Sequence, residues 1–232
     1  MKFKLRGYLK ETRQPIYSAA MVLPFLCIYH IGTVLFHTTN INGADALIIR
    51  ILSALSVHSM FASALVLAAF FTIWQLRTHA KWKIRMGTLL FCFLESVCFA
   101  LILLFGFGWM TAHLSLAISV KPGIVNIILY CGAGVYEELV FRAFLLGILV
   151  AGFSLIFHMK KRSAAAAAAI LGALLFALFH YIGPGRDAFS IGSFAQRTLG
   201  GLYFSVLYVT RGFGVTAASH AIYDILVGII LT

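Results

Sequence analysis

The chain has 232 residues, of which 62% are hydrophobic and only 11% are charged, and its formal net charge is +11. A soluble domain is about half apolar and about a quarter charged, so this composition excludes an ordinary soluble protein and indicates a polytopic membrane protein. The positive charge does not indicate nucleic-acid binding, because the Lys and Arg residues lie in short gaps between apolar runs and form no soluble basic module.

Long apolar runs cover most of the sequence. A bilayer core requires about 20 apolar residues for each helical span. In chain order the runs are 17–36, 46–76, 84–110, 123–157, 164–182, 189–210 and 215–231. They predict an all-α polytopic membrane helical bundle with about seven transmembrane helices. The run 46–76 exceeds one span, so we expect it to tilt or to lie partly in the interface.

The Lys and Arg residues are unequally divided between alternate gaps. Five precede the first run, four separate the second run from the third, three separate the fourth from the fifth, and Arg211 precedes the last. The other gaps hold only Lys121 and Arg186, with Arg50 at an edge. This asymmetry predicts a cytoplasmic N-terminus and a C-terminus on the far side. We expect an integral protein of a bacterial plasma membrane.

Charged residues enter the apolar run 123–157 at one place only, where Glu137, Glu138 and Arg142 stand close together. Ionisable groups at this depth are costly and mark functional sites by default. Glu138 and Arg142 are four positions apart, which on a helix predicts an ion pair. Glu137 points about 100° away from that pair and has no local cation. It is a candidate catalytic acid or base; a structural charge cluster or a proton-transport carboxylate is the alternative.

Two later apolar runs carry histidines. His180 ends the run 164–182, with Phe176 one turn earlier on the same face, and alone it would be read as an interfacial residue. His220 and Asp224 are four positions apart and share a helix face, which suits a metal site, a carboxylate that orients an imidazole, or a buried hydrogen-bonded pair. Taken with the two glutamates, these groups can activate water in a membrane, either directly or through a metal ion.

The ordered trio Glu-Glu-x-x-x-Arg, Phe-x-x-x-His and His-x-x-x-Asp resembles the motifs of the CPBP family, the CAAX proteases and bacteriocin-processing (Abi) intramembrane proteases. The resemblance covers residues 123–232. It implies that Glu137 is the water-activating base, supported by Glu138 and Arg142. It also implies that His180 shares the activation of the water.

By the same resemblance His220 and Asp224 form the oxyanion site. Many members have Asn where this chain has Asp224, and an ionised Asp cannot donate a hydrogen bond to an oxyanion. Asp224 is therefore protonated, or orients His220, or indicates a cation. The family has been described both as metal-free glutamate proteases, which need no cofactor, and as metalloproteases. The second description makes Glu137, His180 and His220 ligands of a divalent metal such as zinc.

These observations predict a single membrane domain, in which residues 1–122 form N-terminal transmembrane helices and 123–232 the catalytic core. The predicted function is that of an intramembrane endopeptidase that hydrolyses a membrane-associated peptide, either prenylated or carrying a sorting signal. The alternatives are a non-catalytic membrane immunity or scaffolding protein with the same fold and a proton-coupled carrier. The expected partners are the peptide substrate and the lipid bilayer, with no nucleic acid. We also expect a cytoplasm-facing polar cavity and an ion pair between Glu95 and Arg197.

Overall fold

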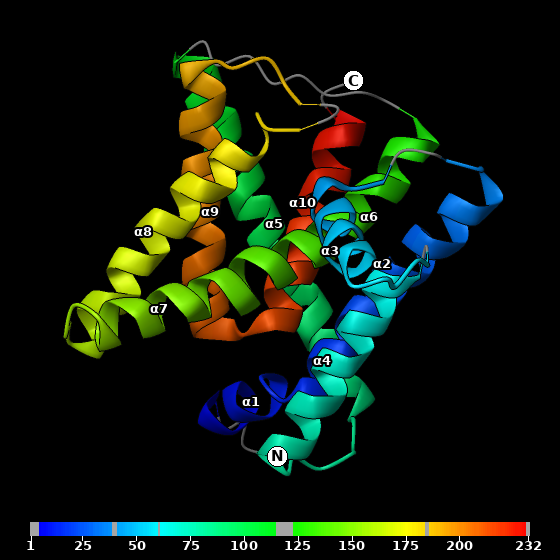
Figure 1. Cartoon of the computed structure of the whole chain (residues 1–232), viewed down its shortest axis with the longest axis vertical. Helices are drawn as coiled ribbons and strands as arrows, with labels where there is room; N and C mark the ends of the chain where they lie inside the picture. The colour runs from blue at the N-terminus through cyan, green and yellow to red at the C-terminus, as the bar shows by residue number, and fades with distance from the viewer. Residues whose placement is uncertain (1–4, 39–40, 60, 115–122, 184–185, 231–232) are drawn as a thin grey trace.

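The computed structural model describes residues 5–38, 41–59, 61–114, 123–183 and 186–230. Within these ranges every regular element is a helix and there is no strand (Figure 1). In chain order the elements are α1 (Leu5–Thr12), α2 (Pro15–Leu35), α3 (Gly43–Ala54), α4 (Ala62–Thr78), α5 (Met86–Leu114), α6 (Ile124–Glu138), the π-helix η1 (Leu139–Leu145), α7 (Leu146–Leu155), α8 (Lys161–Phe179), α9 (Ile191–Arg211) and α10 (Phe213–Ile230).

Several of these helices match the dimensions of a bilayer. Among the described residues, four are long and apolar enough to cross a membrane: Pro15–Leu35, Met86–Gly108, Ile124–Leu155 and Lys161–Phe179. Ala62–Thr78 and Phe213–Ile229 are shorter apolar helices. The prediction of an all-α polytopic bundle is confirmed, whereas the number of about seven spans stays a prediction.

Two apolar runs are not straight helices. Residues 46–76 form two helices, because α3 ends at Ala54 and Ser56 then takes a φ of 64°, which a helix cannot continue. The run 124–155 is helical throughout but passes through the π-helix η1, and α7 leaves it in a different direction from α6 (Figure 1). π-Helical turns occur frequently at functional sites, and this one contains Arg142.

Helix α10 lies at the centre of the bundle, where it contacts α6, α5, α2 and α9. Small residues permit these contacts. Added Cβ atoms at Gly134 and at Gly214 would lie 2.3 and 2.6 Å from backbone atoms of a neighbouring helix. Membrane helices usually associate by close packing at small residues. The hydrophobic effect does not drive helices together inside a bilayer, because the lipid tails are as apolar as the side chains.

Most of the basic residues gather at one end of the bundle, which we call the basic end. It comprises α1 and the connections α4–α5, α7–α8 and α9–α10 (Figure 1). There Arg211 pairs with both carboxylate oxygens of Glu95 at 2.5 Å, and the Tyr8 hydroxyl donates to Glu95 at 2.9 Å. The expected pair of Glu95 with Arg197 is wrong. Arg197 lies about 21 Å further along α9, at about 1.5 Å per residue, and pairs with Asp187.

Candidate active site

Helices α6 and α10 approach each other closely at Gly134. A Cβ atom there would lie 2.3 Å from the backbone nitrogen of Ala221 and 2.5 Å from its Cα, so the spacing of the two helices requires glycine. Glu137 and Glu138 follow Gly134 within one helical turn, and His220 adjoins Ala221. The contact therefore brings the two carboxylates against the imidazole of His220.

Glu138 contacts two buried side chains from different parts of the sequence. Its Oε1 lies 3.0 Å from Nη1 of Arg142 and 2.8 Å from Nδ1 of His220. The guanidinium of Arg142 lies 4.4 Å from the centre of the Phe176 ring, and its Nη2 donates to the carbonyl of Gly201 at 3.3 Å. The predicted Glu138–Arg142 pair is confirmed. The exposed fractions of Glu138 and Arg142 are 0% and 1%, so the pair is part of the core.

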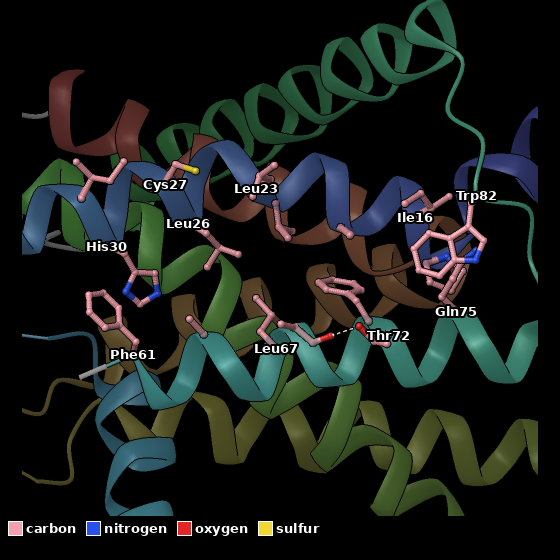
Figure 2. Close-up of a pocket in the computed structure, with 17 residues that line it drawn as sticks. Ile16, Leu23, Leu26, Cys27, His30, Phe61, Leu67, Thr72, Gln75 and Trp82 are labelled. Carbon is pink, nitrogen blue, oxygen red and sulfur yellow. Dashed lines mark hydrogen bonds between the residues drawn. The ribbon is translucent and has the colours of Figure 1, made fainter. Parts of the chain in front are cut away.

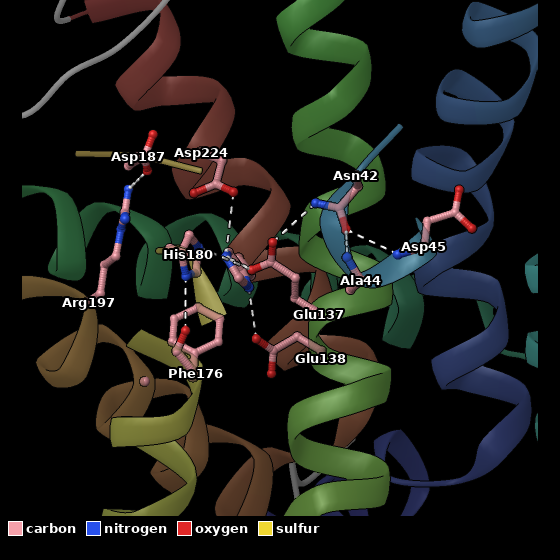
Figure 3. Close-up of polar contacts among 12 residues, drawn as sticks. Asn42, Ala44, Asp45, Glu137, Glu138, Phe176, His180, Asp187, Arg197 and Asp224 are labelled. Atoms are coloured by element: carbon pink, nitrogen blue, oxygen red, sulfur yellow. Dashed lines mark hydrogen bonds and ion pairs between the residues drawn. The ribbon is translucent and has the colours of Figure 1, made fainter. Parts of the chain in front are cut away.

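Glu137 faces both histidines. Its Oε2 lies 4.0 Å from Nε2 of His180 and 3.9 Å from Nε2 of His220 (Figure 3). Its other oxygen, Oε1, accepts a hydrogen bond from Nδ2 of Asn42 at 3.1 Å. The structure thus brings together the two motif histidines and the glutamate that the sequence left without a partner.

The hydrogen bonds of the two rings determine which nitrogen faces Glu137. Nδ1 of His180 lies 2.9 Å from the carbonyl oxygen of Phe176. A carbonyl only accepts, so Nδ1 of His180 carries the hydrogen and Nε2 is free in the neutral ring. Nδ1 of His220 likewise donates to the carboxylate of Glu138. Both rings therefore present Nε2 to Oε2 of Glu137.

The space between Glu137 and the two rings suits a water molecule. Separations of 3.9 and 4.0 Å are too long for direct hydrogen bonds. One water can contact all three atoms, because a bridging water forms a bond of ordinary length to each partner. Such a water would touch a carboxylate oxygen and two imidazole nitrogens, which are groups that take up protons in catalysis.

The same three atoms are the ones that a metal ion would use. Two imidazoles and one carboxylate match the ligand types of catalytic zinc, which would supply a Lewis acid, and the bond from His220 to Glu138 is typical of a second coordination shell. Their spacing fits less well. Ligands of a tetrahedral zinc are roughly 3.4 Å apart, and among the described residues no group of three His, Cys, Asp or Glu has the arrangement of a metal site.

Asp224 lies beside His220, as the spacing predicted. Its Oδ2 is 3.5 Å from Nε2 of His220, and 22% of its side chain is exposed. The His220 ring stacks on Phe204, with centroids 4.4 Å apart and planes at 19°. Glu137, Glu138 and Asp224 therefore surround His220 with carboxylate oxygens within 4 Å. Nε2 of His220 thus lies between the carboxylates of Glu137 and Asp224.

These groups line a polar cavity of about 450 Å³ between α5, α6, α9 and α10 and the end of α8. Glu137, His180, His220 and Asp224 all contribute to its wall, together with Asn42. A larger cavity of about 550 Å³ lies between α2 and α4 (Figure 2). Its lining is almost entirely apolar and contains no carboxylate.

The polar cavity lies away from the basic end. From Glu137 and His220 the cavity extends to the first turns of α6 and α9, the last turns of α10 and the loop before α3. In Figure 1 these segments lie at the end of the bundle opposite α1. The expectation of a cytoplasm-facing cavity is therefore incompatible with the predicted cytoplasmic N-terminus. The side of the membrane that the cavity faces stays a prediction.

Two contacts from the N-terminal half were not predicted from the sequence. Asn42 reaches Glu137, and Nε2 of His30 lies 2.7 Å from the hydroxyl of Tyr136. The signal available for Asn42 was local: an Asn beside Gly43 is a typical helix cap. Nothing in the spacing showed that the capped helix would lie beside α6.

Residues 119–226, slightly less than half of the chain, match the family model described as Type II CAAX prenyl endopeptidase Rce1-like. No curated protein and no solved structure matches the chain. The matched range contains all three motifs and all six side chains predicted to form the site. Residues 119–226 thus match the family that the three motifs resemble, the CPBP family of CAAX and bacteriocin-processing intramembrane proteases.

Proposed function

We propose that the chain is an intramembrane endopeptidase that hydrolyses a peptide bond with water activated by Glu137 and His180. One observation carries the proposal: in a polar cavity, Oε2 of Glu137 lies 4.0 Å from Nε2 of His180 and 3.9 Å from Nε2 of His220, separations that a bridging water spans. The family name supports the reaction class and the membrane-associated substrate. On this reading no cofactor takes part.

In the first step, Glu137 takes a proton from the water, with His180 accepting a hydrogen bond from it. The water oxygen then forms a bond to the carbonyl carbon of the substrate, and the carbonyl oxygen becomes an oxyanion. His220, protonated among its three carboxylates, donates from Nε2 to that oxyanion. The negative charge of Asp224 stabilises the protonated ring of His220. An ionised Asp224 would therefore have a role although it cannot donate a hydrogen bond to the oxyanion.

In the second step, the protonated Glu137 gives its proton to the leaving amine, and the carbon–nitrogen bond breaks. The carboxylate is regenerated, so one group acts first as a base and then as an acid. Glu138 and Arg142 do not touch the reacting atoms. They hold His220 in position through its Nδ1 hydrogen.

The distribution of Lys and Arg favours an N-terminus in the cytoplasm of a bacterial cell. With that orientation the cavity lies in the half of the membrane that faces away from the cytoplasm. Single-cysteine variants at positions 82 and 187, labelled with a membrane-impermeant maleimide in intact cells, test this. Labelling only at position 187 supports this orientation. Labelling only at position 82 would show that the N-terminus lies on the opposite side of the membrane.

The function itself is tested by comparing the membrane proteomes of cells that produce the wild-type protein or the Glu137→Gln variant. The proposal expects new peptide termini that appear only with the wild-type protein. A non-catalytic immunity or scaffolding protein, or a proton-coupled carrier, would give no such termini. Equal expression of the two proteins in the membrane fraction is the control.

A further inference from the structure

The loop between α2 and α3 places one side chain of the N-terminal half directly on the candidate base. Nδ2 of Asn42 donates to Oε1 of Glu137 at 3.1 Å (Figure 3). Asn42 lies far outside residues 119–226, the range that matches the family. We propose that Asn42 is a positioning residue that holds Glu137 in the orientation that hydrolysis requires; this inference rests on the proposed function.

The orientation of the Asn42 amide is determined by its neighbours. Asn42 caps α3, and its Oδ1 accepts hydrogen bonds from the backbone nitrogens of Ala44 at 2.8 Å and Asp45 at 3.4 Å. A flipped amide would set its own NH2 group against these two donors. Because Oδ1 accepts the backbone hydrogen bonds of α3, Nδ2 is the atom of the amide that points at Glu137.

The backbone of Asn42 is held as well. Its N–H donates to the hydroxyl of Tyr29 at 3.3 Å, and that hydroxyl donates to Oδ2 of Asp45 at 2.5 Å. Tyr29 and Asp45 are 1% and 2% exposed. Buried hydrogen bonds thus connect α2, the loop and α3, so Asn42 presents its amide from a rigid support.

The bond to Asn42 gives the two carboxylate oxygens of Glu137 different roles. The last torsion of a glutamate is broad, so an unrestrained carboxylate turns about it readily. With Oε1 bonded to Asn42, Oε2 is the oxygen that faces His180 and His220. Removing the amide hydrogen donor would let the carboxylate turn away from the water that it activates.

The other charged and titratable groups around Glu137 cannot replace this bond. His180 approaches from α8, His220 and Asp224 from α10, and Glu138 and Arg142 lie on the same helical run. His180 and His220 both face Oε2 of Glu137, and none of these groups is hydrogen-bonded to Oε1. Among the residues that the structure describes, the amide of Asn42 thus donates the hydrogen bond that fixes the rotation of the carboxylate.

Two variants separate this role from simple helix capping. Asn42→Ser and Asn42→Asp both keep a side-chain oxygen that caps a helix about as well as Asn, so a purely structural role predicts an unchanged kcat. Positioning predicts that kcat falls about tenfold or more in Asn42→Ser, since a hydrogen bond to a charged group is lost. Asn42→Asp should lose more, because its carboxylate repels Glu137. In both variants KM and Tm should stay near the wild-type values.

The control is Ser190→Asp, which makes the same kind of change at the cap of α9, where the Ser190 side chain accepts from the backbone nitrogen of Ser193 at 3.1 Å. It should leave kcat unchanged. The probe is a farnesylated, internally quenched peptide with a C-terminal CAAX sequence, supplied in detergent micelles, and wild-type protein and Glu137→Gln are measured in parallel.

Each outcome has one meaning. If the wild-type protein cleaves the peptide and both Asn42 variants keep the wild-type kcat, the positioning role is wrong and the proposed function stands. If the wild-type protein does not cleave it, or Glu137→Gln cleaves it equally well, the proposed function fails and this inference fails with it. A drop in kcat with unchanged KM and Tm, absent from Ser190→Asp, supports the positioning role.

Discussion

Nδ1 of His220 lies 2.8 Å from Oε1 of Glu138, although the two residues are 82 positions apart in the sequence. This bond joins α10 to α6 and turns the other ring nitrogen of His220 toward Glu137. Because the same oxygen of Glu138 also faces Arg142, one carboxylate balances a buried cation and orients a histidine of the proposed active site.

A first prediction separates these two tasks. Glu138→Gln leaves Arg142 as a buried cation without its carboxylate, which costs roughly 3–5 kcal/mol of stability. The Tm in detergent should fall accordingly. The double variant Glu138→Gln/Arg142→Met removes both charges and should recover most of the Tm. It should remain inactive, because His220 still lacks its carboxylate; recovery of activity in the double variant would show that the His220–Glu138 bond is not needed.

A second prediction concerns the contact at Gly134. Gly134→Ala would push a Cβ atom to within 2.6 Å of backbone atoms of Ala221, which cannot move without shifting α10. We expect a loss of about 1–3 kcal/mol in stability and a large loss of activity, measured as Tm and kcat. Gly147→Ala is the matched control, because no atom lies within 4 Å of an added Cβ there. It should be neutral or stabilising by up to about 1 kcal/mol; equal behaviour of the two variants would contradict the proposed helix spacing.

The sequence predicted contacts within a helix better than contacts between helices. The spacing of Glu138 and Arg142 predicted their ion pair, because residues four positions apart are neighbours on any helix. The pair of Glu95 with Arg197 was wrong, because it required the relative depth of α5 and α9. That depth depends on where each helix ends and how it tilts, which hydropathy does not show.

The candidate site shows the same limit. Order and spacing of three motifs, read through a family resemblance, identified the groups that the structure brings around Glu137. They did not reveal Asn42, because its cap is a local feature and its bond to Glu137 is a tertiary one. The π-helix at Arg142 was also unforeseen, since no residue in Leu139–Leu145 interrupts a helix by its own preference.

A third prediction concerns pH and the basic end, outside the spanning helices. Burial raises the pKa of Glu11, but hydrogen bonds from Arg85 and Tyr17 outweigh it and hold the pKa of that carboxyl below its ordinary value. A lowered pKa in the folded state gives stability that is present above the ordinary pKa and is lost as the pH falls through the lowered one. Glu11→Gln should therefore lower Tm at pH 7. It should also reduce the fall in Tm that occurs as the pH is lowered. A Tm that is equally acid-sensitive in Glu11→Gln would contradict this assignment.

A fourth prediction concerns metal dependence. If water is activated by Glu137 and His180 alone, proteolysis should survive 1,10-phenanthroline, and elemental analysis of the purified protein should find less than one equivalent of zinc. Loss of activity that zinc restores would instead assign Glu137, His180 and His220 as ligands. In that case His180→Ala should also lose bound zinc, which provides a second readout independent of proteolysis.

The central claim is that Glu137 takes the proton of the attacking water. The most direct measurement is kcat for the farnesylated, quenched CAAX peptide with purified wild-type protein and with Glu137→Gln, which keeps the shape of the side chain and removes its basicity. The account predicts a loss of about 10²–10⁴-fold in Glu137→Gln at an unchanged Tm. Cleavage by Glu137→Gln at the wild-type rate would contradict it.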